Sequence, residues 1–118
     1  MPVLLDSRGA PLKRSFVHVS DLVGAILAAL GNEAARGQLF NIGMNEPVDY
    51  AAATQYLGAR RGLPAVSVAT PYHSNWFDNA KARQMLGWQP LVGLEDLIDR
   101  AWDYVRAPDD PRVVWYPG

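Results

Sequence analysis

The residues best suited to acid–base or nucleophilic chemistry lie close together, between positions 73 and 78. His73 and Ser74 are sequence neighbours, and Asp78 follows four residues after Ser74. A hydrolytic triad needs the base within hydrogen-bond reach of the nucleophile. Adjacent side chains of an extended segment point to opposite sides, so the sequence disfavours hydrolysis here.

Asn75 and Trp76, in the same segment, are candidates for binding a substrate. A polar amide beside an aromatic face is an arrangement that suits a sugar ring. The alternative is that Trp76 packs in its loop against the C-terminal tail, because aromatic side chains serve mainly as core residues. Both interpretations remain open from the sequence.

Metal and thiol chemistry find little support in the sequence. His18 and Asp21 could supply two metal ligands, but the sequence offers no third one, so a structural histidine at a strand end is the favoured interpretation. The chain contains no cysteine, which excludes disulfides, thiolate zinc sites and cysteine nucleophiles.

The motifs that would bind a nucleotide cofactor are also absent from the sequence. None of the 10 glycines forms the closely spaced group that lets backbone amides approach a pyrophosphate. The two lysines, Lys13 and Lys81, belong to no phosphate-binding loop, and no tyrosine has a lysine four residues after it. We therefore expect no cofactor to be bound by this chain alone.

Composition indicates a globular protein of ordinary charge. The 118 residues are 49% hydrophobic and 19% charged, with a net charge of -1, so neither nucleic acid nor an anionic membrane is an expected partner. The longest uncharged apolar stretch, residues 22–32, is well short of the ~20 residues of a spanning helix. The N-terminus has no export signal, so a cytoplasmic location is expected.

Periodicity and turn residues predict short strands alternating with helices. In the last predicted helix, apolar residues recur at the i, i+3, i+4, i+7 spacing of one buried stripe, at positions 94, 97, 98, 101, 102 and 105. Trp88 and Trp102 are expected to be core residues. The first helix, with Ser20 as its predicted N-cap, is apolar on most faces and should be buried on more than one side. The predicted strands are 14–19, 38–42 and 66–68, and the predicted helices are 22–30, 50–61, 79–86 and 94–105. For the helix at 50–61, Asp49 is the expected cap and Gly62 the expected left-handed terminator.

These elements predict a small, incomplete α/β domain with few short strands and about four helices. Three short strands cannot by themselves form a doubly wound sheet, so the chain looks like part of a larger layered arrangement. We expect an α/β domain over residues 1–107, followed by an apolar tail over residues 108–118 that must pack on something.

Three segments together resemble one family. They are 14–22 (RSFVHVSDL), 40–48 (FNIGMNEPV) and 78–95 (DNAKARQMLGWQPLVGLE). In order and spacing they resemble the C-terminal, substrate-binding part of the extended short-chain dehydrogenase/reductases, the NAD-dependent epimerase/dehydratase family. Residues 76–79 and the end of the chain also resemble the uronate dehydrogenase-like branch.

The resemblance implies the substrate side of an NAD-dependent sugar or sugar-acid epimerase, dehydratase or dehydrogenase. Full-length members use NAD and a Tyr-x-x-x-Lys pair, both supplied by a preceding domain, so this chain would be inactive alone. An arginine at the position of Arg14 holds the substrate phosphate in nucleotide-sugar members, where its planar fork of donors suits an oxyanion. A structural ion pair is the alternative role for Arg14.

The resemblance also indicates which class of ligand and which partner to expect. A second phosphate arginine usual in the family has no counterpart in residues 68–71, which favours a smaller sugar or sugar acid as ligand. The partner would be a cofactor-binding half or a second copy in a homodimer. The alternatives are a free-standing, self-associating module that binds small molecules, or an inactive remnant.

Overall fold

The structure is a computed structural model that describes residues 1–105 and 108–109. In this part of the chain it has four α-helices and a few short strands, which confirms the predicted α/β class. The predicted apolar tail, except for residues 108 and 109, lies outside the described residues. The helices are α1 (Val19–Ala29), η1 (Glu33–Ala35, a 3-10 helix), α2 (Tyr50–Arg61), α3 (Ala80–Leu86) and α4 (Leu94–Trp102).

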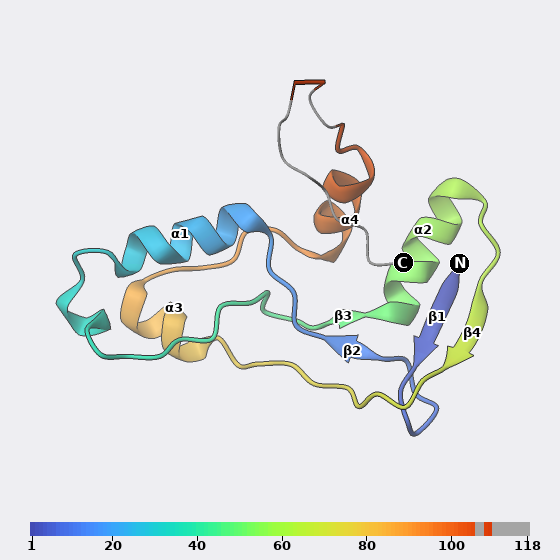
Figure 1. Ribbon diagram of the computed structural model, residues 1–118, viewed down its shortest axis with the longest axis horizontal. Coiled ribbons are helices and arrows are strands. Elements are labelled where there is room, and N and C mark those ends of the chain that lie inside the picture. Colours follow the sequence, from blue (N-terminus) through green and yellow to red (C-terminus); the bar gives the residue numbers. More distant parts are fainter. Residues whose placement is uncertain (106–107, 110–118) are drawn as a thin grey trace.

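The strands form two separate two-stranded sheets. One is parallel and pairs Pro2 with Val66 at its start, and the other is antiparallel. Figure 1 shows the parallel pair and α2 at one end of the molecule, with α1 and α3 at the other. The strands are β1 (Pro2–Leu5), β2 (Lys13–Arg14), β3 (Val48–Asp49) and β4 (Val66–Ala69), paired as β1–β4 and β2–β3.

Local signals in the sequence place the ends of α2 correctly. The Asp49 carboxylate accepts hydrogen bonds from the backbone N–H groups of Ala51 and Ala52, at 2.8 and 3.3 Å. Gly62 ends the helix with φ +64°, a left-handed conformation that glycine adopts without steric cost. Both ends were predicted from the sequence.

The N-terminus of α1 differs from the prediction. The cap is His18, whose Nδ1 accepts a hydrogen bond from the backbone N–H of Ser20, so Ser20 lies inside the helix. The imidazole nitrogen takes the part expected of the hydroxyl, because residue 18 is the last with extended backbone. This use of His18 agrees with the prediction of a structural histidine.

Two predicted strands are shorter than expected or absent. The strand predicted over 14–19 is reduced to Lys13–Arg14, and residues 38–42 form no strand at all. Within the described residues, β2 pairs with β3, and no strand pairs with residues 38–42. A stretch with high β propensity forms no ladder when it lacks a partner strand. β1 was not predicted, while β4 confirms the strand expected at 66–68.

One cluster of buried residues lies between α1 and α3. The sequence predicted that α1 is buried on more than one side, whereas in the described chain only the side that faces this cluster is buried. Ala25, Ala82 and Trp88 form the cluster, and the Trp88 indole N–H donates to the backbone carbonyl of Asp21 at 2.9 Å. Trp88 is therefore a core residue, as predicted. Trp102, also predicted as core, is 51% exposed and stacks on the Arg61 guanidinium, so that prediction is wrong for the described chain.

Candidate functional site

The segment that carries Asn75 and Trp76 runs beside the segment that carries Arg14. The backbone N–H of Asn75 donates to the carbonyl of Lys13 at 3.1 Å. Two residues further on, the backbone N–H of Phe77 donates to the Ser15 hydroxyl at 2.8 Å. These contacts bring together candidate residues that are 61 positions apart in the chain.

Arg14 and Asn75 are joined directly. The Arg14 Nη1 donates to the Asn75 Oδ1 at 2.6 Å, and the guanidinium carbon lies 5.7 Å from the centre of the Tyr72 ring. The structure thus places Arg14 in a polar pair with Asn75, next to an aromatic ring. A guanidinium has five N–H donors, so an oxyanion can still bind to the donors that Asn75 does not use.

Trp76 follows Asn75 and is 53% exposed. Its ring is not packed into the core of the described residues, and the neighbouring Tyr72 and Phe77 are exposed as well. The exposed Tyr72 ring next to the Arg14 guanidinium offers a flat apolar surface and a charge to a polar ligand. Sequence reasoning missed Tyr72, which gave no signal in the sequence beyond its aromatic type.

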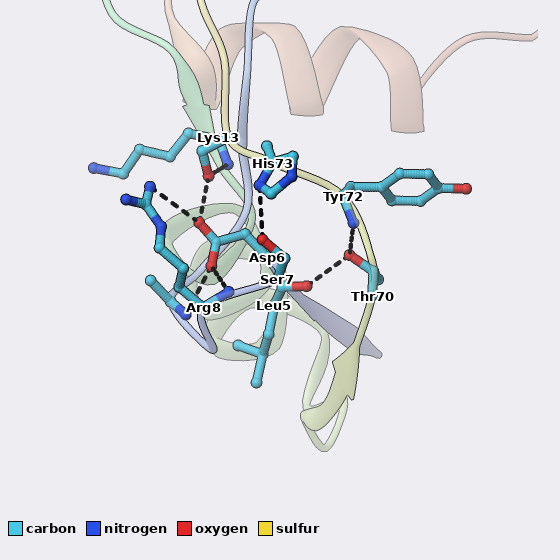
Figure 2. A network of polar contacts seen from close by, with 10 residues as sticks. Leu5, Asp6, Ser7, Arg8, Lys13, Thr70, Tyr72 and His73 are labelled. Carbon is cyan, nitrogen blue, oxygen red and sulfur yellow. Dashed lines mark hydrogen bonds and ion pairs between the residues drawn. The ribbon is translucent and has the colours of Figure 1, made fainter.

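Asp6 stabilises the candidate site through a hydrogen bond with Ser74. It is buried, and its Oδ2 accepts a hydrogen bond from the Ser74 hydroxyl at 3.1 Å. The Ser74 oxygen in turn accepts from the backbone N–H of Lys13 at 3.0 Å, as part of the network in Figure 2. Ser74 therefore links the turn after β1 to both segments of the candidate site.

The carboxyl of Asp6 is held in its ionised form. The backbone N–H groups of Arg8 and Ala10 donate to its Oδ1 at 2.9 and 3.1 Å. The hydrogen bond from Arg8 is the main reason that the pKa of Asp6 lies below its ordinary value, despite the opposing effect of burial. Asp6 was also missed from the sequence, because its partners are distant in the chain.

His73 and Ser74 do not form a catalytic pair. His73 Nδ1 lies 2.7 Å from the Ser7 Oγ, whereas Ser74 is turned toward Asp6. Figure 2 shows His73 paired with Ser7 on one side of the network. Asp78 is further along the chain, where its Oδ1 accepts from the backbone N–H of Ala80 at 2.7 Å. The expectation that neighbouring side chains diverge is confirmed.

The two candidate metal ligands, His18 and Asp21, each have other hydrogen-bond partners. No group of three or more potential ligands gathers among the described residues. Asp21, the second candidate ligand, turns away from His18 and accepts hydrogen bonds from the backbone N–H groups of Leu91 and Val92.

The N-termini of α2 and α4 do not suit a dinucleotide. A pyrophosphate needs free backbone N–H groups and no nearby negative charge. The α2 terminus is capped by the Asp49 carboxylate, and the first turn of α4 contains Glu95 and Asp96. These two helix N-termini therefore do not suit a pyrophosphate.

The described residues contain no helix long and apolar enough to cross a membrane. No model of a known protein family matches the sequence.

Curated relatives are enzymes of nucleotide sugars. The chain is 31% identical over 100 residues to the dTDP-4-dehydro-6-deoxyglucose reductase of Escherichia coli, and 31% identical over 98 residues to the UDP-glucose 4-epimerase of Mycolicibacterium smegmatis. These matches include 80% and 79% of this chain but only 31% of each relative. The chain thus spans about a third of the length of the curated relatives it matches.

Solved structures share the fold over a similar length. A short-chain dehydrogenase/reductase superfamily protein of Agrobacterium tumefaciens, solved with bound NAD, superposes with a TM-score of 0.77 at 28% identity, over 85% of this chain and 31% of that one. The UDP-glucuronic acid 4-epimerase of Bacillus cereus gives a TM-score of 0.67 at 27% identity, over 87% and 33%. The chain therefore has the fold of part of a short-chain dehydrogenase/reductase, and its relatives are sugar epimerases and reductases of that family.

Proposed function

We propose that this chain is the substrate-binding part of an NAD-dependent enzyme that acts on a sugar acid or a nucleotide sugar. Arg14 binds the anionic group of the substrate, and Asn75 and Trp76 contact the sugar. The observation that carries the proposal is the Arg14–Asn75 hydrogen bond of 2.6 Å, which holds a cation and an amide together beside the exposed ring of Tyr72. The relatives named above act on sugars that carry anionic groups.

The charge of this site favours a ligand with a single anionic group near Arg14. A carboxylate or one phosphate can bind the free edge of the guanidinium with two parallel hydrogen bonds. Residues 68–71 supply no second cation for a diphosphate. A sugar acid is therefore the ligand we favour. The UDP-glucuronic acid of the similar epimerase differs from such a ligand because it carries a diphosphate beside its carboxylate.

The reaction itself needs groups outside the sequence given. It has no Tyr-x-x-x-Lys pair to move a proton and no glycine-rich turn for NAD. When bound by a complete enzyme, NAD would exchange a hydride with the substrate. The role of this chain is to bind and orient the substrate, and the 118 residues alone should show no turnover.

Ligand binding to the purified chain tests the proposal. Glucuronate, UDP-glucuronate and UDP-glucose are each titrated while the melting temperature is followed, because a ligand that binds only the folded state raises it. An anionic ligand should raise the melting temperature, and Arg14→Gln should weaken its binding by roughly 10-fold or more, the effect of losing a charged hydrogen bond. Arg8→Gln is the matched control, because Arg8 is a highly exposed arginine on a neighbouring turn.

Each outcome bears on one part of the proposal. Binding of UDP-glucose but not of glucuronate would assign the site to nucleotide sugars instead of sugar acids. An equal loss of binding in both arginine variants would remove Arg14 from the site. If no ligand raises the melting temperature, or if the chain alone reduces NAD with a sugar, the proposal is wrong.

A further inference from the structure

Ser7 and His73 form a pair that the proposed function does not use. The Ser7 Oγ lies 2.7 Å from the His73 Nδ1, although the two residues are 66 positions apart in the chain. Both residues are exposed, and within the described chain neither side chain has another hydrogen-bond partner. A serine hydroxyl becomes a nucleophile when an adjacent imidazole can take its proton. The tautomer of His73 that carries its proton on Nε2 leaves Nδ1 free to do so.

The backbone brings the two side chains together at one edge of the parallel sheet. Ser7 follows the end of β1 and His73 follows the end of β4, and the carboxyl ends of paired parallel strands lie at the same edge. The backbone N–H of Ser7 donates to the carbonyl of Tyr72 at 2.7 Å, so the two segments stay joined beyond the strands. Ligands of open α/β sheets bind at this edge.

The sequence neighbours of both residues hold the pair in place. Asp6, which precedes Ser7, accepts a hydrogen bond at 3.1 Å from Ser74, which follows His73. Asp6 is buried and also accepts two backbone N–H groups of its own turn. Figure 2 shows the contact between Ser7 and His73 within this network. Because the two side chains are already positioned, little conformational entropy is lost when they react.

The hydrogen bonds of the turn after β1 determine which substrates the pair suits. Hydrolysis of ordinary esters and amides relies on free N–H donors that stabilise the oxyanion of the intermediate. The backbone N–H groups of residues 7–10 all donate within the chain, to Tyr72 and to Asp6. The turn therefore supplies no oxyanion hole, and the pair suits acyl donors whose leaving group departs readily, such as thioesters and aryl esters.

A second contact between a serine and a histidine provides a comparison within the same chain. The Ser20 Oγ lies 2.7 Å from the His18 Nδ1. That nitrogen also accepts the backbone N–H of Ser20 at 3.2 Å, as the cap of α1. An imidazole nitrogen has one lone pair, so at His18 the backbone N–H competes with the hydroxyl proton. His18 is therefore the weaker base toward its serine, because the Nδ1 of His73 has no such competitor in the described chain.

We infer that Ser7 is a site of covalent acylation by thioesters and aryl esters, with His73 as its general base. The Ser7 Oγ attacks the carbonyl carbon of the donor while its proton moves to the His73 Nδ1. A bond forms between the Oγ and the carbonyl carbon. The bond from that carbon to the leaving group breaks, and its electron pair goes to the leaving group. The imidazolium then gives its proton to the leaving group, so nothing is oxidised or reduced.

The acylated chain should accumulate. The leaving group of its serine ester is an alkoxide, which departs poorly where no oxyanion hole assists, so water releases the acyl group slowly. One acyl group per chain is therefore expected, without turnover. The inference does not rest on the proposed function, because neither Arg14 nor a sugar takes part in the reaction.

Acetylation of the purified chain tests the inference, with p-nitrophenyl acetate as the aryl ester and S-phenyl thioacetate as the thioester. Mass spectrometry of peptides follows each modified residue and separates serine from lysine side chains. With both probes, Ser7 should be acetylated roughly 10-fold faster than Ser20 or more, and His73→Gln should slow the reaction of Ser7 by roughly 100-fold, a usual contribution of a positioned base. His18→Gln is the matched control and should leave the rate at Ser7 unchanged.

A second variant separates proton transfer from a structural role. His73→Asn keeps a hydrogen-bond acceptor beside the Ser7 hydroxyl but cannot take its proton. It should react as slowly as His73→Gln, yet melt at the temperature of the unmodified chain because residue 73 is exposed.

Four results would overturn the inference. Equal acetylation of Ser7 and Ser20 would show that exposure alone explains the reaction. An unchanged rate at Ser7 in both His73 variants would remove the base. Release of nitrophenolate by Ser7→Ala at the rate of the unmodified chain would make His73 itself the nucleophile. The fourth is that neither probe acetylates Ser7.

Discussion

Asp21 offers the sharpest test of how α1 is attached to the rest of the chain. It is buried in the first turn of α1, and its Oδ2 accepts hydrogen bonds from the backbone N–H groups of Leu91 and Val92, at 3.1 and 3.0 Å. These two bonds tie the helix to the loop that leads into α4. Asp21→Ala removes the acceptor and leaves both N–H groups without it.

The magnitude follows from the number and kind of bonds. A hydrogen bond to a charged group contributes about 1.5 kcal/mol or somewhat more to the free energy of unfolding, so the loss of two should cost about 3 kcal/mol. The hydrogen bond to Val92 is buried, so water cannot easily replace the lost carboxylate there. Since domains are stable by only about 5–15 kcal/mol, a loss of this size is a large fraction of the total.

Urea unfolding followed by tryptophan fluorescence measures this loss. Asp21→Asn keeps a neutral oxygen acceptor and should cost about half as much, because neutral hydrogen bonds are weaker. Glu33→Ala is the control, since Glu33 is exposed and pairs only with Arg36 across one turn; it should change the free energy of unfolding by less than about 0.5 kcal/mol. If Asp21→Ala had as small an effect as this control, the reasoning about α1 would be refuted.

Two further predictions concern titrating groups. The pKa of Asp6 is lowered in the folded chain, mainly by the hydrogen bond from the Arg8 backbone N–H. Asp6 therefore stabilises the folded chain at pH values above its unfolded pKa. This stability is lost as the pH falls through the folded pKa. The melting temperature should therefore fall more steeply below about pH 4 in the unmodified chain than in Asp6→Asn, and parallel curves would contradict this. The pKa of Tyr56 is raised because its hydroxyl donates to Asp99 at 2.8 Å. In absorbance titrations, with Tyr56→Phe identifying its signal, Asp99→Asn should lower that pKa; an unchanged titration would exclude the contact.

The Asp99 contacts also show how α4 is held against α2. Arg60 donates to both carboxylate oxygens of Asp99, at 2.6 Å each, and Tyr56 donates to one of them. The pKa of Asp99 is lowered, first by the hydrogen bond from Tyr56 and then by Arg60. The last helix was predicted over residues 94–105 with one buried stripe, but it ends at Trp102 and none of its residues is buried in the described chain. The polar contacts of Asp99 join residues 39 and 43 positions apart, so the sequence could not predict them.

Structural features that depend on residues close together in the chain were predicted correctly. The cap at Asp49, the stop at Gly62, and the helical spacing of residues 94, 97, 98 and 101 depend on contacts within about one helical turn. The same local character explains the error at the start of α1, where His18 and Ser20 are both capable caps and the backbone conformation decides between them.

The partners of the candidate site residues were settled by tertiary structure. Arg14 and Asn75 could be selected by type and by resemblance, but their hydrogen bond requires two segments to lie side by side. Asp6, which fixes Ser74 behind them, gave no signal because a buried carboxylate is recognised only by the donors that surround it.

The sequence by itself determined the class of the chain, the ends of α2, and the absence of cofactor and metal motifs, since these follow from residue type and short spacing. Only the tertiary structure decided which predicted strands pair and which face of α1 is buried. A strand is stabilised by its neighbour and an apolar face by what covers it, and neither partner is encoded in the segment itself. Residues 38–42, predicted as a strand, and α1, predicted to be buried on more than one side, are the places where sequence and tertiary structure differ most.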